Sequence, residues 1–266
     1  MSLLDQHMVI QEIKTILKVY PDFVRFYQYA QPFYVPRYDL AEKRPPSDKK
    51  KSSQVDPEEY ELVSRNKAKT RLLDLTLSNP FDLFVTFTFA KDRQNADGKK
   101  RQMNFWLNNQ RNLHGKFGYI MVPEYHKDGE SLHFHGLFMG YNGNLVDSGK
   151  KQNGRTIFNI NSYRGGFTTA VKIDNIAKVA GYIGKYITKD MPKFKNKQRY
   201  WRSNGLKLPL KIINPLLNND DKEPFISIYK DSKKEIFEIQ GQLSDKDLAR
   251  IADYGKRRYD DLYAAE

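Results

Sequence analysis

The chain has 266 residues, a formal net charge of +13 and no cysteine. This length allows one large or two small domains, and the missing thiols exclude disulfides, thiolate catalysis and cysteine-type zinc sites. No apolar run is long enough to span a bilayer, and no basic segment followed by an apolar stretch opens the chain, so we expect a cytoplasmic protein without a membrane partner. Because the cations alternate with aromatic residues, nucleic acid is the favoured polyanionic partner.

Two helices joined by a linker are predicted for the first part of the chain. Apolar spacing over residues 2–20 predicts an amphipathic helix that ends at Pro21. Residues 41–56 are polar, basic and proline-containing, which indicates a flexible linker or an exposed loop. A second helix is expected from Pro57 to Leu77, with Asp56 as its N-cap. Its cations form either a solvated face or a phosphate-contacting face; they are Arg65, Lys67, Lys69 and Arg71.

The middle of the chain reads as strands interrupted by helices. Residues 81–90 alternate cleanly and predict a strand, with Phe84 and Thr86 on one face and Val85 and Phe87 on the other. A helix over 100–114 closed by Gly115, strands over 117–124 and 132–139, a loop over 140–154, and strands over 155–160 and 167–173 follow. We therefore expect an α+β fold with a central antiparallel sheet of about five strands and flanking helices.

The last part of the chain begins with a basic segment that contains aromatic residues. Such composition suits single-stranded nucleic acid, with bases stacked on rings, although an ordinary basic loop has the same composition. The candidate binding residues here are Lys193, Lys195, Lys197, Arg199, Tyr200, Trp201 and Arg202. A hairpin over 225–240 and a closing helix capped by Ser244 follow. The expected division is an N-terminal helix and linker (1–56), a central domain (57–211) and a C-terminal hairpin and helix (212–266).

A candidate metal site comes from the hairpin that surrounds Asp128-Gly129, a strong short-range turn signal. With these two residues as the loop, Glu124 lies directly opposite His133, and His135 shares a strand face with His133. A carboxylate and two imidazoles then converge, which predicts a three-ligand open site for a divalent cation. A His-x-His pair can also be two hydrogen-bonded histidines without a metal, and His126 is the rival third ligand.

A second candidate site lies on a helix predicted over residues 174–190. Its apolar face carries Ile183 and Ile187, and the border of that face carries Tyr182 and Tyr186, four residues apart. Border tyrosines are common, with the ring in the core and the hydroxyl in water. The functional interpretation is a pair of nucleophiles, because the neighbouring lysines would favour the phenolate and bind a phosphate. These lysines are Lys178, Lys185 and Lys189.

Together, the strand FVTFTF, the His-Phe-His strand and the helix YIGKYITKD closely resemble the rolling-circle replication initiators of small single-stranded DNA phages and plasmids. These are HUH endonucleases, named for their histidine, hydrophobic residue, histidine motif. The likeness covers roughly residues 65–211, and the doubled tyrosine resembles the two-tyrosine branch of phage initiators. The resemblance implies Glu124, His133 and His135 as metal ligands, Tyr182 and Tyr186 as nucleophiles, and Lys185 and Lys189 as their cationic partners.

The implied activity is metal-dependent nicking of single-stranded origin DNA in the cytoplasm of a bacterial host cell. With Mg²⁺ or Mn²⁺ bound, a tyrosine would become linked to the 5′-phosphate and leave a free 3′-hydroxyl. A host helicase and polymerase are the implied partners, because the chain lacks the helicase domain that some members append.

Three other functions fit the same residues. A plasmid-mobilisation relaxase or a single-strand transposase uses the same chemistry on different DNA. A non-cutting protein that binds single-stranded nucleic acid, DNA or RNA, would not need the tyrosines to face the histidines.

Overall fold

The computed structural model of the chain describes residues 9–37, 56–215 except 127, 193 and 195–197, and 225–241, with a few isolated residues beside them. The chain divides into two compact units. One is Val55–Leu208, and the other combines Met1–Gln54 with Pro209–Glu266. None of the described helices is long and apolar enough to cross a membrane.

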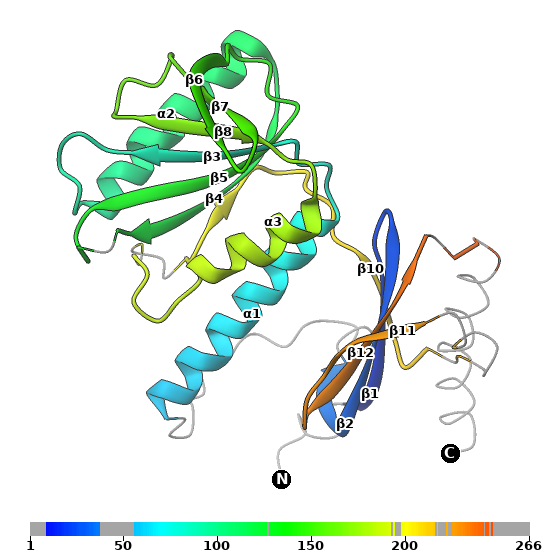
Figure 1. The fold of residues 1–266 in the computed structure, drawn as a ribbon. Helices are drawn as coiled ribbons and strands as arrows, with labels where there is room; N and C mark the ends of the chain where they lie inside the picture. The colour runs from blue at the N-terminus through cyan, green and yellow to red at the C-terminus, as the bar shows by residue number, and fades with distance from the viewer. Residues whose placement is uncertain are drawn as a thin grey trace, which may run out of the picture. The chain divides into compact units, whose positions relative to one another are not determined.

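The Val55–Leu208 unit is built on a seven-stranded antiparallel sheet with three helices (Figure 1). The strand order is β6-β7-β8-β3-β5-β4-β9. The strands are β3 (Leu83–Thr88), β4 (Gly118–Tyr125), β5 (Leu132–Met139), β6 (Val146–Gln152), β7 (Arg155–Asn159), β8 (Thr168–Lys172) and β9 (Trp201–Arg202). The helices are α1 (Pro57–Leu77), α2 (Ala96–His114) and α3 (Ile176–Ile183), and the last continues into the 3-10 turn η2 (Gly184–Tyr186). The α+β class and the antiparallel sheet are confirmed.

One face of this sheet is closed by α2. Alternate residues of β3 and β5, among them Phe87 and Phe134, are fully buried there. The helix contributes Met103, Trp106 and Leu107 to the same cluster. Because side chains alternate along a strand, every second residue of β3, β4 and β5 is committed to this core.

The opposite face is only partly closed. Ile120 and Leu137 of the sheet pack against Leu72 and Leu75 of α1 and against Ile183 just before η2. Further along the same strands this face carries Thr86, Glu124 and the two histidines of β5, as the register shows. The helices therefore cover one end of the face, and polar side chains occupy the rest.

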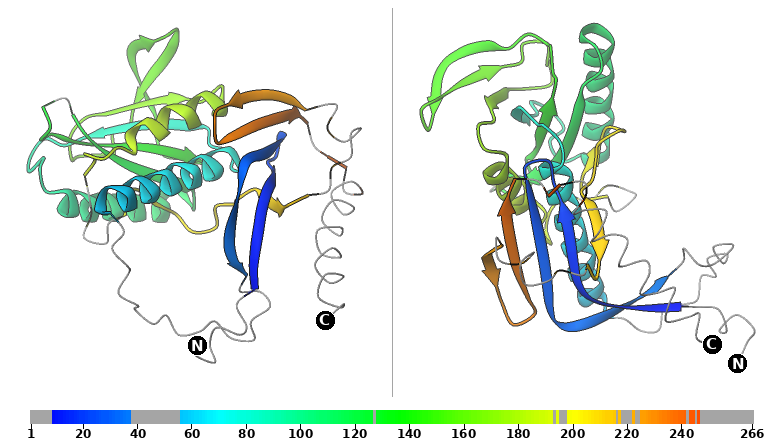
Figure 2. Two further views of the ribbon diagram at one scale, coloured as in Figure 1. Left: turned by 90° about the horizontal axis from the view of Figure 1, so that it is seen from below. Right: turned by 90° about the vertical axis from the view of Figure 1, so that its right-hand side faces the viewer.

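Most central elements were predicted, but residues 140–154 were not. This expected loop contains β6, which pairs with β7 around the two-residue turn Asn153-Gly154. Both turn residues have positive φ, 50° and 78°, which matches the type I′ turn that Asn-Gly favours. The hairpin extends beyond the rest of the sheet in both views of Figure 2. The helix predicted for 174–190 is also shorter, because α3 and η2 end at Tyr186.

The second unit contains a five-stranded antiparallel sheet of order β10-β1-β2-β12-β11. Its strands are β1 (Val9–Val19), β2 (Phe23–Arg37), β10 (Leu210–Ile213), β11 (Ile226–Lys230) and β12 (Lys234–Gln240). The hairpin predicted over 225–240 is confirmed. The helix predicted over 2–20 is wrong, because β-branched residues dominate β1 and its neighbours β2 and β10 pair with it. The expected linker at 41–55 and the closing helix after Ser244 lie outside the described residues.

Candidate active site

The β4–β5 hairpin has the predicted register, with Glu124 paired to His133. Asp128 fixes the loop between the strands, because its carboxylate accepts hydrogen bonds from the backbone N–H groups of Glu130 (2.9 Å) and Ser131 (2.8 Å). These bonds hold the pKa of Asp128 well below its usual value. Gly129 adopts a φ of 72°, the left-handed conformation that glycine tolerates. The turn chemistry of the sequence thus sets the register of the site.

The Glu124 carboxylate contacts His135, which is diagonal to it, rather than His133. The Oε2 atom lies 2.7 Å from His135 Nε2, and the other ring nitrogen, Nδ1, lies 3.1 Å from Thr86 Oγ1. His135 is buried, with 6% of its surface exposed. Both ring nitrogens therefore have partners, which fixes the orientation of the imidazole.

The other two histidines of the hairpin lie together. The rings of His126 and His133 are 5.1 Å apart. Burial lowers the pKa of His133, and the neighbouring His126 and His135 lower it further, while Glu124 and Asp128 oppose the shift. A lowered pKa keeps this imidazole neutral, which is the form that binds a metal.

The predicted metal ligands fit a divalent cation by donor chemistry, because imidazole and carboxylate are ligands of such ions. They are not arranged as a closed ligand set: in the described part of the chain, no three His, Asp or Glu side chains are grouped closely enough to hold an ion. The metal site at Glu124, His133 and His135 stays a prediction, and so does the choice of His126 as a rival ligand.

Both tyrosines of α3 and η2 lie against this cluster. The Tyr186 ring stacks on His135, with ring centroids 3.9 Å apart and planes 7° from parallel. Tyr182 meets Tyr186 edge to face at 5.3 Å, and it is 48% exposed. Burial raises the pKa of Tyr186, and its hydrogen bond to Tyr182 and the charge of Glu124 raise it further. The structure therefore brings the two phenols to the His135–Glu124 pair.

Local contacts hold the tyrosines in this place. Asn175 caps α3 by accepting a hydrogen bond from the backbone N–H of Lys178 (2.9 Å). Ile183 and Ile187 are fully buried against the sheet. A helix anchored by these two residues must present the intervening Tyr186 to the polar end of the sheet face.

The two predicted lysine partners differ in their contacts. Lys185 Nζ lies 5.9 Å from the ring centroid of Tyr182. Lys189 Nζ forms an exposed ion pair with Glu58 of α1, at 3.2 Å. Only Lys185 therefore lies beside a tyrosine in this structure.

Residues 82–191 match the family model of the replication-associated protein ORF2. The match covers less than half of the chain, but it spans the elements from β3 to η2. It includes both predicted nucleophiles and all three predicted metal ligands. Searches of curated proteins and of solved structures found no match. The similarity to a replication-associated family supports a role in DNA replication and is consistent with a replication initiator.

The predicted nucleic-acid-binding residues are placed unevenly. On α1, Lys67 and Arg71 are exposed, whereas Arg65 and Lys69 are half-buried. Of the basic segment that follows the family match, Arg202 is exposed and Tyr200 is half-buried. Lys193, Lys195 and Lys197 lie outside the described residues.

Two members of that segment have internal contacts instead. Arg199 is buried and paired with Glu61 of α1. Trp201 is also buried, with its ring 4.9 Å from that of Phe134 in the core. Their side chains stabilise the unit and do not form an exposed stacking surface.

Thr86 and Phe84 of β3 belong to the site but were not predicted to. Thr86 bonds His135, and the Phe84 ring lies 5.8 Å from His135 and 5.6 Å from Tyr182. The clean alternation of β3 did place both residues on one strand face. That this face is the one with the histidines follows only from the pairing of β3 with β5.

Proposed function

We propose that the chain is a replication initiator that nicks single-stranded DNA by transferring a phosphodiester to a tyrosine. The observation that carries this proposal is the packing of Tyr186 on His135, which in turn bonds Glu124. A phenol is rarely placed this way for packing alone, because a fully apolar side chain would fill the same space without a hydroxyl to satisfy. The similarity of residues 82–191 to the replication-associated protein ORF2 family supports the same activity.

In the proposed reaction, the phenolic oxygen of one tyrosine attacks the scissile phosphorus in line. A bond forms between this oxygen and phosphorus, the bond from phosphorus to the 3′-oxygen breaks, and the phenol proton is transferred in net terms to the departing 3′-oxygen. The products are a 5′-phosphotyrosyl link and a free 3′-hydroxyl. Since one phosphodiester replaces another, the strand can be rejoined by the reverse reaction.

The remaining residues have distinct parts in this reaction. Lys185 beside Tyr182 favours the phenolate and attracts the phosphate. Mg²⁺ or Mn²⁺, held by Glu124, His133 and His135, would polarise the phosphate and neutralise charge that develops on it. Thr86 holds the His135 ring in place.

Tyr182 is the better candidate for the first attack. It is 48% exposed, so a DNA strand can reach it, whereas Tyr186 is packed on His135. Tyr186, one turn away, would then accept the strand after a round of synthesis. The order of the two attacks thus follows from accessibility.

The test is a denaturing gel of the protein incubated with Mn²⁺ and a random-sequence pool of single-stranded oligonucleotides labelled at the 3′ end. The label sits there because the proposed adduct retains the 3′ segment. We expect a covalent adduct that Tyr182→Phe nearly abolishes and Tyr186→Phe reduces less. Tyr60→Phe is the matched control, since this α1 tyrosine is exposed and distant in sequence. An adduct in the Tyr182→Phe, Tyr186→Phe double variant would refute the proposal.

A further inference from the structure

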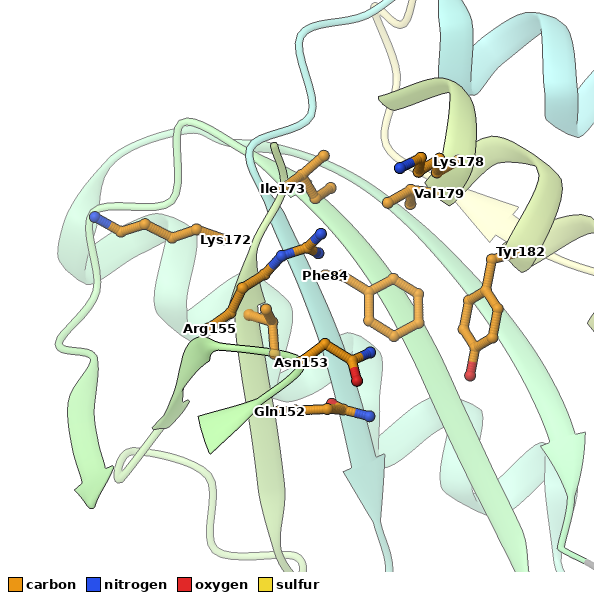
Figure 3. Close-up of a pocket in the computed structure, with 10 residues that line it drawn as sticks. Phe84, Gln152, Asn153, Arg155, Lys172, Ile173, Lys178, Val179 and Tyr182 are labelled. Carbon is orange, nitrogen blue, oxygen red and sulfur yellow. The ribbon is translucent and has the colours of Figure 1, made fainter. Parts of the chain in front are cut away.

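A cavity of about 340 Å³ lies on the other side of Tyr182 from His135 (Figure 3). It is bounded by the β6–β7 turn, by β3 and β8, and by α3. Phe84 joins the two places, because its ring contacts both Tyr182 and His135. The volume is within the range of sites that bind small molecules or single groups of a larger ligand.

The floor of the cavity is apolar and partly aromatic. It consists of Phe84, Val171, Ile173 and Val179, with the Tyr182 ring beside Phe84. The two rings meet edge to face at 67°. Aromatic rings on the surface of a nucleic-acid-binding protein provide stacking surfaces for unpaired bases, whatever the base.

The wall opposite α3 carries two amides. The side chains of Gln152 and Asn153 extend from the β6–β7 turn toward the Phe84 ring in Figure 3. The positive φ values of Asn153 and Gly154 close this turn tightly, so the amide is carried on a defined backbone. An amide both donates and accepts hydrogen bonds, and Asn and Gln pair with base edges in this way.

Cations lie at the rim. The Arg155 guanidinium is directed toward Phe84 in Figure 3 and is held by Asp174, with 2.7 Å between Nη2 and Oδ2. Lys178 of α3 is exposed and has no ion-pair partner among the described residues. Asp174 offsets part of the charge of Arg155, so Lys178 is the freer contact for a phosphate. Lys172 also borders the cavity, but its side chain extends away from it.

We propose that this cavity binds the base of one nucleotide of the single-stranded DNA substrate. The base would pack on Phe84, its edge would bond Gln152 and Asn153, and its phosphate would lie near Lys178 and Tyr182. The inference rests on the proposed function, because it gives the nicking site a built-in sequence preference next to its nucleophile.

The test measures binding rather than cleavage. Fluorescence anisotropy in EDTA would give the Kd of the full chain for labelled homopolymers of dA, dC, dG and dT, each about 12 nucleotides long. We expect the wild type to bind one base several-fold more tightly than the others. Gln152→Ala with Asn153→Gly should bind that homopolymer about 10-fold more weakly and lose the preference. Glycine at 153 retains the positive φ, so the turn is kept.

Lys172→Ala is the matched control, because it removes a cation from the same border without emptying the cavity. It should leave the ranking of the four homopolymers unchanged. An unaltered ranking in the double amide variant would overturn the proposal. Equal competition by deoxynucleoside monophosphates and by oligonucleotide, at the same nucleotide concentration, would also overturn it, since the site would then take free nucleotides.

These results separate the cavity from the nicking chemistry. Loss of base preference in the amide variant supports the cavity even if no covalent adduct ever forms. A covalent adduct together with an unaltered preference would support the nickase and refute the cavity.

Discussion

The buried ion pair between Arg199 and Glu61 should contribute measurably to the stability of the Val55–Leu208 unit. The Arg199 side chain is 7% exposed, its Nη2 atom lies 2.5 Å from Glu61 Oε1, and Nη1 donates to the carbonyl of Thr188. Removing one partner of a fully buried pair costs about 3–5 kcal/mol. Because Glu61 is 24% exposed and regains some hydration, we expect about 2–3 kcal/mol for Arg199→Met.

This loss corresponds to a fall in Tm of roughly 5–10 °C for a unit of this size. Tryptophan fluorescence is the appropriate assay, because the two tryptophans of the chain, Trp106 and Trp201, both lie in the core of this unit. Lys189→Met is the matched control. Its ion pair also links α1 to the segment after η2, but its partners are 60% and 78% exposed, so a loss of about 1 kcal/mol or less is expected. Equal shifts in Tm for both variants would refute this reasoning.

Three further outcomes are expected. Chelation by EDTA should abolish adduct formation and excess Mn²⁺ should restore it on the same denaturing gel; adducts that persist in EDTA would contradict the predicted metal ligands. Gly166→Ala should lower stability by about 1–3 kcal/mol in a thermal melt, because its Cβ would overlap the carbonyl of Thr88. Gly181→Ala, which meets no atom within 4 Å, should instead be neutral or stabilising. Trp201→Ala should cost about 3–5 kcal/mol by circular dichroism; weaker DNA binding at an unchanged Tm would contradict its place in the core.

The local parts of the site could be predicted from the sequence. The Asp128-Gly129 turn fixes the register of its own hairpin, so the pairing of Glu124 with His133 follows from residues close in the chain. The spacing of Tyr182 and Tyr186 likewise needs only the helical period. What the register could not show is that the Glu124 carboxylate reaches diagonally to His135, since that depends on side-chain conformation.

The long-range parts could not be predicted. Apolar residues such as Ile13, Ile16 and Leu17 fit a helical period, and β1 is a strand only because β2 and β10 pair with it. Asn214, distant in sequence, accepts hydrogen bonds from the backbone N–H groups of Lys14 and Thr15. No window of sequence around β1 contains this information. The β6–β7 hairpin is different, because the Asn153-Gly154 signal was present and was interpreted as part of a loop.

The interleaved order of the two units has a consequence for synthesis on the ribosome. The hairpin of β1 and β2 is translated before the Val55–Leu208 unit, whereas β10 and β12, which flank it, are translated afterwards. At about 5–20 residues per second, the intervening unit takes on the order of ten seconds to emerge. During this delay both outer edges of the nascent hairpin are without their final neighbours, and such edges recruit other chains. The unit with the tyrosines can mature early, while the five-stranded sheet must be completed last and would depend most on chaperones.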